Sequence, residues 1–210
     1  ALPDTVHLLR GNHETVNMNR MYGFEGEVGA KVSDSRAMEL FTGVFRTLPL
    51  AAVVGGKVFV AHGGIFARDG VTLSDVEAID RFKEPPEGGG DMSDLMWSDP
   101  QPFPGRGPSK RGVGKSFGPD ITAKFLEENG LSLLVRSHEV KDEGYLVEHN
   151  GKCITVFSAP NYCDSMGNKG AVVTLDQDCK PSFVQFKESP HPPARPMQYA
   201  TGLAQMMGMG

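Results

Sequence analysis

Apolar positions along the chain follow two periodicities, and together these predict an α/β protein. Apolar runs that end in glycine or polar residues are typical of strands, and they occupy residues 5–11, 56–64 and 131–139. A different spacing, every third or fourth position, marks Met38, Phe41, Val44, Phe45 and Leu48. That spacing predicts an amphipathic helix over residues 36–48, which ends before Pro49.

Two further helices are predicted downstream. Residues 72–82 form a short helical pattern whose N-cap is either Thr72 or Ser74. Residues 119–130 begin with a proline, which suits the first helical turn, and end with a glycine, which suits the C-terminal end.

The last third of the chain is predicted to be all-β. Asn150–Gly151 separates two alternating apolar runs, and this dipeptide is the strongest short-range hairpin signal. Two more strands are expected over residues 171–176 and 182–187. The coarse class is therefore α/β with a substantial antiparallel component.

Differences in composition separate a helical region, a loop-rich region and a C-terminal tail. Residues 17–54 have a mostly helical pattern, whereas residues 83–111 are rich in Pro and Gly and predict long surface loops. Residues 1–189 are expected to form one domain, and residues 190–210 a Pro- and Met-rich C-terminal tail.

Charge and cysteine content limit the binding partners and the cellular compartment that can be expected. The formal charge of −5 gives no general attraction to nucleic acid or anionic lipid. Three cysteines without a CxxC pair predict a reducing, cytoplasmic or nuclear compartment and no disulfide framework. No secretion signal or membrane span is expected. Because the chain starts without methionine and close to a predicted strand, we expect an N-terminally truncated protein.

Several predicted strands end in residues suited to metal or acid–base chemistry. The run ending at Gly11 is followed by Asn12 and His13, and the next two strands lead into His62 and His138. Ligands of open α/β sheets collect outside the strand ends, so these side chains predict one shared site. Two imidazoles and an amide oxygen suit Mn, Fe or Zn better than Ca or Mg.

Each of these features also has a simpler explanation. A single histidine at a strand end is more often a hydrogen-bonded structural residue, and Gly-Asn or Gly-Gly is a common turn. The segment "GVGKS", residues 112–116, resembles a phosphate-binding P-loop but lacks the required first glycine, because Ser109 occupies that position. Arg111 lies in the same basic loop and could grip phosphate through its planar guanidinium, or could simply be solvated.

Motifs in a fixed order give the chain a specific family resemblance. The segments "LLRGNHE", "HGG", "LMWSDP", "RGVGKSFG", "RSHE" and "SAPNYC" occur in the order found in the PPP family of serine/threonine phosphoprotein phosphatases. The chain is most similar to the type-five branch, from about Pro3 to Phe186. The resemblance implies a metallophosphatase-type β-sandwich flanked by helices in a four-layer α/β/β/α arrangement, of which only the C-terminal part is present.

The resemblance also implies roles for individual residues. Asn12, His62 and His138 would bind the second metal of a dinuclear centre, and His13 would be the general acid. Arg111 and Asn12 would bind the substrate phosphate, and Tyr162 would line the cleft. Supporting or loop positions are expected for Glu14, Arg136, Asp99 and Cys163.

Two aspartate-rich motifs of the family are absent from the chain. They supply the ligands of the first metal, the carboxylate that bridges both metals and a second phosphate-binding arginine. The complete enzyme would hold two divalent ions (Mn, Fe or Zn), of which this chain supplies ligands for one. We therefore expect the 210 residues alone to be inactive.

The predicted activity is metal-dependent hydrolysis of phosphoserine and phosphothreonine in proteins. The resemblance further implies phosphoprotein substrates and a chaperone or scaffold partner bound through a domain outside this chain. Two alternatives stay open at this point. One is a dinuclear hydrolase of nucleotides or polyphosphates, because fold alone does not fix the substrate. The other is a non-catalytic interaction fragment.

Overall fold

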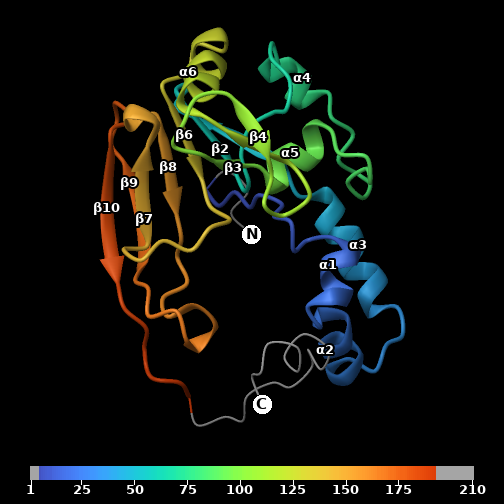
Figure 1. The fold of residues 1–210 in the computed structure, drawn as a ribbon. Helices are drawn as coiled ribbons and strands as arrows, with labels where there is room; N and C mark the ends of the chain where they lie inside the picture. Colours follow the sequence, from blue (N-terminus) through green and yellow to red (C-terminus); the bar gives the residue numbers. More distant parts are fainter. Residues whose placement is uncertain (1–4, 193–210) are drawn as a thin grey trace.

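A mixed five-stranded sheet forms the centre of the protein, in a computed structural model that describes residues 5–192. The strand order is β1 (Ala51–Val54), β2 (Val58–Ala61), β6 (Leu133–Arg136), β8 (Cys153–Val156) and β7 (Tyr145–Glu148). β2, β6 and β8 run parallel, and the two outer strands are antiparallel to their neighbours. The carboxyl ends of the three parallel strands therefore lie at one edge of the sheet (Figure 1).

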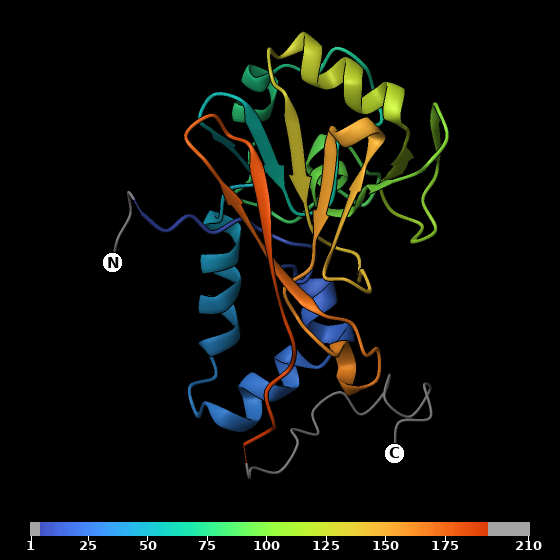
Figure 2. The ribbon, with the colours of Figure 1, turned by 90° about the vertical axis from the view of Figure 1, so that its left-hand side faces the viewer.

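A two-stranded ribbon packs on one face of this sheet. β9 (Gly170–Leu175) pairs antiparallel with β10 (Pro181–Phe186), and Figure 2 shows the ribbon crossing the sheet obliquely. Val58, Val135 and Ile154 of the sheet are buried against this ribbon, which contributes Val173 and Phe183. Because side chains alternate along a strand, their neighbours in the sheet point to the opposite face.

That opposite face is covered by helices α4 (Leu73–Glu77), α5 (Asp91–Trp97) and α6 (Pro119–Glu128). Phe59 and Leu134 of the sheet are buried in the same cluster as Leu95 of α5 and Phe125 of α6. Phe59 and Phe125 meet edge to face, with ring centroids 5.1 Å apart. Beside this core lies a small sheet of β3 (Asp99–Pro100), β5 (Lys115–Phe117) and β4 (Arg106–Pro108).

Three N-terminal helices form a separate group below the sheet in Figure 1: α1 (Val16–Met21), α2 (Phe24–Lys31) and α3 (Ala37–Thr47). Phe24 of α2 packs against Phe41 and Phe45 of α3, with ring centroids 5.2 and 5.9 Å apart. No helix in the described part of the chain is both long and apolar enough to cross a membrane.

Most of the predicted elements are confirmed. α3 ends before Pro49, Thr72 caps α4 in a capping box with Asp75, and α6 has a proline in its first turn. β7 and β8 form the predicted hairpin, in which the short 3₁₀ turn His149–Gly151 connects the strands. The helix–sheet–sheet order agrees with the expected sandwich, while the outer face of the ribbon keeps Val172 and Val184 half exposed.

Three of the predicted elements are wrong. Residues 5–11 form no strand, because the backbone hydrogen bond from the N–H of Arg10 to the carbonyl of Pro49 is not continued as a ladder within the described residues; Val6 and Leu8 are 60% and 64% exposed. The helical pattern assigned to 17–54 ends earlier, and residues 51–54 are strand β1. Residues 83–111, predicted as loops, contain α5, β3 and β4. The predicted tail falls largely on residues 193–210, which lie outside the described residues.

Candidate metal centre

Two neighbouring parallel strands deliver two imidazoles to the same edge of the central sheet. His62 directly follows β2, and His138 lies two residues beyond the end of β6. The backbone N–H of Ser137 donates to the carbonyl of His62 at 3.0 Å, which ties the two strand ends together. His138 adopts a left-handed backbone conformation (φ 71°), so the chain turns sharply at this residue.

Asn12 reaches the two histidines from the other side. Its side chain is buried, and its Oδ1 lies 2.8 Å from Nε2 of His62. The same Nε2 lies 3.1 Å from Nδ1 of His138. One amide oxygen and two ring nitrogens from distant parts of the chain therefore converge on one point, and this is the arrangement predicted for Asn12, His62 and His138.

The donor atoms fit a first-row divalent metal. Two ligands at right angles on such an ion, with bonds of about 2.0–2.2 Å, are themselves roughly 2.8–3.1 Å apart. Burial is the main reason why the pKa of His62 falls to about 4 and that of His138 to about 2. Nearby positive side chains lower both values further, so both rings are neutral, which is the form that binds metals.

The three donor side chains are nevertheless all neutral, which is unusual for the binding of a divalent cation. Within residues 5–192, no three side chains drawn from His, Cys, Asp and Glu gather where they could hold a metal ion. The candidate centre thus depends on an amide oxygen as its third donor. Such a neutral set offsets less of the desolvation of a dication than a set containing a carboxylate would.

The turn that carries Asn12 is fixed by its own side chains. Glu14 folds back so that its Oε2 accepts from the backbone N–H of Gly11 at 2.8 Å, and Thr15 donates to the Asn12 carbonyl at 2.8 Å. A Cβ on Gly11 would lie only 3.0 Å from the ring of His62. Glycine is thus needed for the close approach of this turn to the imidazole, and Glu14 holds the backbone of the turn through Gly11.

His13 lies next to the metal-binding candidates and faces a different neighbour. Its ring packs against Tyr22, with centroids 4.9 Å apart, and its carbonyl accepts from Nδ2 of Asn19 at 2.6 Å. Partial shielding from water lowers the pKa of His13, although the nearby Glu14 carboxylate acts in the opposite direction.

The glycine pair Gly63–Gly64 brings the chain after β2 against helix α5. A Cβ on Gly63 would lie 2.4 Å from the backbone N of Trp97 and 2.5 Å from the carbonyl carbon of Met96. Trp97, held in this way, places its ring edge to face with that of His138, at 5.6 Å between centroids. The glycines of "HGG" therefore shape the wall of the site.

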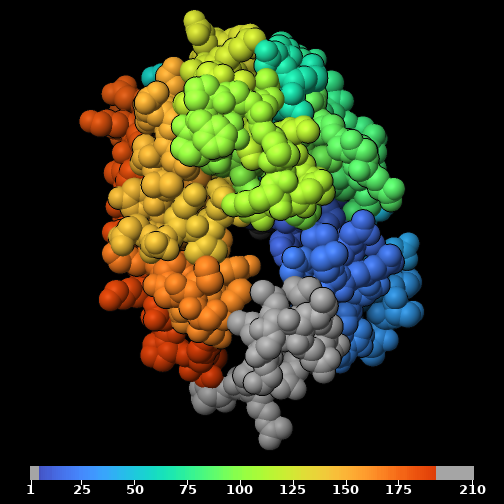
Figure 3. Space-filling model, viewed as in Figure 1, coloured from blue at the N-terminus to red at the C-terminus, as the bar shows by residue number. Residues whose placement is uncertain are grey.

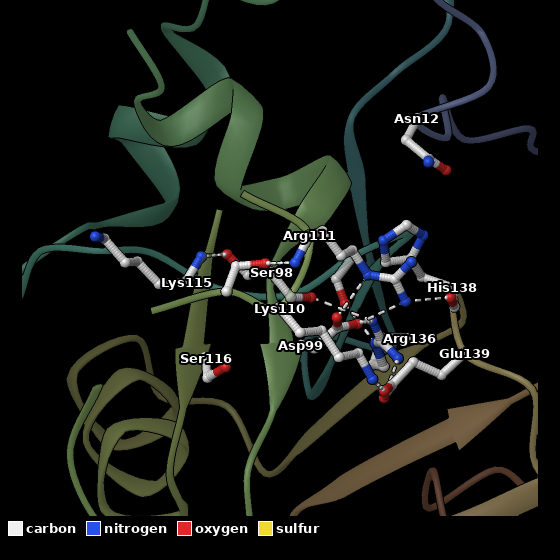
Figure 4. A network of polar contacts seen from close by, with 12 residues as sticks. Asn12, Ser98, Asp99, Lys110, Arg111, Lys115, Ser116, Arg136, His138 and Glu139 are labelled. Atoms are coloured by element: carbon white, nitrogen blue, oxygen red, sulfur yellow. Dashed lines mark hydrogen bonds and ion pairs between the residues drawn. The ribbon is translucent and has the colours of Figure 1, made fainter. Parts of the chain in front are cut away.

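Arg111 and Arg136 share one carboxylate, that of Asp99 (Figure 4). Oδ2 of Asp99 accepts from Nε of Arg111 at 2.7 Å, and Oδ1 accepts from Nη2 of Arg136 at 2.7 Å. Arg136 is completely buried and also donates to the carbonyls of Gly63 and Ser98. Arg111 is partly exposed, and its Nη2 donates to the carbonyl of His138 at 3.0 Å. Arg136 therefore links Asp99 to the backbone of Gly63 and Ser98, while its supporting role in catalysis stays a prediction.

The loop after β8 carries Tyr162, which is 41% exposed. Asn161, Cys163 and Asp164 all have positive φ in this loop (46°, 56° and 56°). The ring of Tyr162 meets that of Phe157 edge to face at 5.1 Å, and burial raises the pKa of its hydroxyl. Figure 3 shows a hollow in the surface that this loop, the N-terminal helices and the loops around β4 and β5 border on three sides.

Asn19 was not predicted as a site residue, and Glu139 was predicted only as the last residue of the strand end 131–139. Asn19 holds the backbone of His13, and Glu139 binds Lys110 and Arg136 through its two oxygens. Nothing in their spacing distinguishes them from solvated polar residues. Only "RSHE", which places Glu139 directly after His138, offered a signal.

Comparisons with known proteins give the site its context. A family model described as "Calcineurin-like phosphoesterase" matches residues 1–142. Serine/threonine-protein phosphatase 5 of Arabidopsis thaliana is 62% identical over 97% of this chain and 38% of its own length, and its Homo sapiens counterpart is 58% identical over 97% and 41%. The chain thus spans about two fifths of these relatives. The solved structure of a Saccharomyces cerevisiae protein serine/threonine phosphatase, described as similar to human phosphatase PP5, aligns with a TM-score of 0.85 at 43% identity. This alignment covers 93% of this chain and 64% of the other.

Proposed function

Because the chain belongs to the calcineurin-like phosphoesterase family, we propose that it is the metal-binding part of an enzyme that removes phosphate from phosphoserine and phosphothreonine in proteins. The resemblance to the type-five phosphatases, inferred from the motifs, agrees with the relatives at 62% and 58% identity. The observation that carries the proposal is the convergence of Asn12, His62 and His138, with Arg111 held beside them.

Arg111 is proposed to bind the phosphate group. Its Nε and Nη2 are occupied by Asp99 and the His138 carbonyl, while its Nη1 makes no hydrogen bond to any described residue. The remaining N–H groups of a fixed guanidinium can therefore donate to a phosphoryl oxygen, and they can stabilise the charge that develops there.

A metal ion bound by Asn12, His62 and His138 would act as a Lewis acid on the phosphoryl group and would lower the pKa of a bound water. The second ion of the family's centre, and the identity of the metal (Mn, Fe or Zn), also belong to this proposal. The described residues supply donors for one ion only.

His13 is proposed as the general acid. A serine or threonine alkoxide is a poor leaving group, and its departure is faster when a proton is supplied. The imidazole of His13 follows Asn12 directly, so it is available beside the candidate metal centre. Packing against Tyr22 holds the ring in one orientation.

Phosphoproteins in the cytoplasm or nucleus are the proposed substrates. All three cysteines are free, and Cys153 is buried, in keeping with a reducing compartment. A chaperone or scaffold partner bound outside this chain is a further part of the proposal, based on the resemblance alone.

The test is phosphate release from a phosphoserine peptide in the presence of Mn²⁺. It uses the longest natural protein that contains this chain, with the 210-residue chain assayed in parallel. We expect His13→Asn to lower kcat about 10²–10⁴-fold, whereas His7→Asn, at an exposed position, leaves it unchanged. Activity on dinucleoside polyphosphates but not on the peptide would replace the proposed substrate class, and turnover that survives His13→Asn would remove its assigned role.

A further inference from the structure

We propose that the ion pair between Lys110 and Glu139 positions Arg111 for phosphate binding. In this proposal, which rests on the proposed function, Lys110 is a positioning residue and does not touch the substrate. Nζ of Lys110 donates to Oε1 of Glu139 at 2.7 Å. The residue after Lys110 and the residue before Glu139 make the second link, from Nη2 of Arg111 to the carbonyl of His138 at 3.0 Å.

Besides these two links, the loop that carries Arg111 is held by the bond from Nε of Arg111 to Asp99, and at its end by the bond from the N–H of Lys115 to Oγ of Ser98. Its internal hydrogen bonds are local: the N–H of Arg111 donates to Oγ of Ser109, and the N–H of Gly112 donates to the Ser109 carbonyl. Gly112 and Gly114 both have positive φ (77° and 71°), and glycine loses more conformational entropy on ordering than other residues. A loop of this composition is well ordered only if side chains fasten it to a fixed part of the fold.

Glu139 is such a fixed point. Its side chain is only 13% exposed, and its second oxygen accepts from Nη1 of Arg136 at 3.1 Å and lies 3.4 Å from Nζ of Lys141. Arg136 is itself buried and bound to Asp99. The Lys110 ammonium is thus attached to the same rigid network that holds the other end of the Arg111 side chain (Figure 4).

Charge explains why Lys110 acts through this contact and not on phosphate directly. An ammonium is a compact point charge, and here it lies against a carboxylate that is largely removed from water. Arg111 instead keeps N–H groups free for a ligand. The two neighbouring cations therefore differ in function: Lys110 holds the loop in place, and Arg111 binds the phosphate.

The test compares Lys110→Met with Lys115→Met in the longest natural protein that contains this chain. Lys115 is exposed at the start of strand β5, which follows this loop; it forms no ion pair with any described residue, and it points away from the network in Figure 4. The readouts are the inhibition constant of inorganic phosphate, and KM and kcat for a phosphoserine peptide, all with Mn²⁺. Lys110→Met is expected to weaken phosphate binding about two- to fivefold, the range that corresponds to a partly exposed ion pair; Lys115→Met is expected to have no effect.

Combination with Arg111→Lys separates positioning from direct contact. If Lys110 acts through Arg111, Lys110→Met has no further effect on phosphate binding in the Arg111→Lys protein. An additive loss in the double variant would show that Lys110 contacts phosphate itself and would overturn the proposal. An unchanged inhibition constant in the single variant would overturn it as well.

Hydrogen exchange of the backbone amides of residues 109–114, measured on the same protein without metal, keeps this inference separate from the proposed function. Faster exchange in Lys110→Met and in Glu139→Gln, but not in Lys115→Met, supports the fastening role even if no phosphatase activity is found. Unchanged exchange would overturn that role even in an active phosphatase.

Discussion

Asp99 holds Arg111 through a 2.7 Å hydrogen bond from Nε to its Oδ2. The Asp99 side chain is only 6% exposed, whereas the Arg111 side chain is 27% exposed. Burial of the acceptor keeps the distance short without competition from water, and partial exposure of the donor leaves it accessible to a ligand. The pair thus connects the buried core of the site to its surface.

Asp99→Asn is expected to lower both stability and phosphate binding. The substitution removes the shorter of the two ion pairs of the buried Arg136, whose other charged partner is Glu139, and breaking a buried ion pair costs up to about 3–5 kcal/mol. Urea denaturation measures the loss, with exposed Asp178→Asn as the control, expected within about 0.5 kcal/mol of the parent. An Asp99→Asn protein as stable as the control would contradict the central role of this carboxylate.

Gly63→Ala is expected to destabilise the protein by about 1–3 kcal/mol or more, the cost of overpacking. The new Cβ would lie 2.4 Å from the backbone N of Trp97, which cannot rotate away as a side chain could. Gly43→Ala is the matched control, because nothing lies within 4 Å of its Cβ position in α3. Replacing a mid-helix glycine there is expected to stabilise the protein by roughly 0.5–1 kcal/mol. Equal effects of the two substitutions in thermal or urea unfolding would refute the packing argument.

His149 predicts a loss of stability in acid. Its Nε2 donates to the carbonyl of Gln101 at 2.9 Å, so its Nδ1 is left to accept from the hydroxyl of Thr122 at 2.7 Å. Burial is the main reason why the pKa of His149 is lowered from 6.5. The unfolded chain therefore takes up a proton at a higher pH than the folded protein does. The contribution of neutral His149 to the free energy of unfolding is complete above the pKa of this histidine in the unfolded chain. It declines as pH falls below that value towards the pKa of His149 in the folded protein.

The measurement compares the free energy of unfolding of the parent and His149→Asn between pH 8 and pH 5. Asparagine tolerates the positive φ of 52° at this position. The difference between the two proteins is expected to shrink as pH falls, because only the parent has the buried imidazole. A difference that stays constant with pH would contradict the assignment.

Mn²⁺ is expected to raise the melting temperature of the protein, and EDTA to reverse the rise. An ion that binds only the folded state at a concentration 100 times its Kd adds about 2.7 kcal/mol of stability. His62→Gln is expected to abolish most of the shift, since its Nε2 contacts both other donors. His7→Gln, at an exposed position, serves as the control. A full Mn²⁺ shift in His62→Gln would mean that the ion binds elsewhere.

Local sequence signals predicted those elements that local interactions decide. The helix stop before Pro49, the capping box at Thr72 and the hairpin at Asn150–Gly151 all depend on neighbours in the sequence. Residues 5–11 have a strand pattern but form no strand, because a strand also needs a partner with which to hydrogen-bond. Helix α5 was missed because the Gly- and Pro-rich residues before it suggested a loop.

The candidate site was predictable only in part for a similar reason. Strand-end positions and family motifs indicated Asn12, His62 and His138, and the structure brings their donor atoms within 2.8 and 3.1 Å. The partners that hold the site together were not predictable from spacing. Asp99 binds Arg111, which lies 12 positions away in the sequence, and Glu139 binds Lys110, which lies 29 positions away. Such pairings follow from the folded topology alone.

A crystal structure of the Mn²⁺-loaded protein, with anomalous scattering recorded at the manganese absorption edge, is the most direct test of the proposed centre. We expect an anomalous peak bonded to Oδ1 of Asn12, Nε2 of His62 and Nδ1 of His138. Manganese bound elsewhere, with these three side chains still in contact with one another, would contradict it.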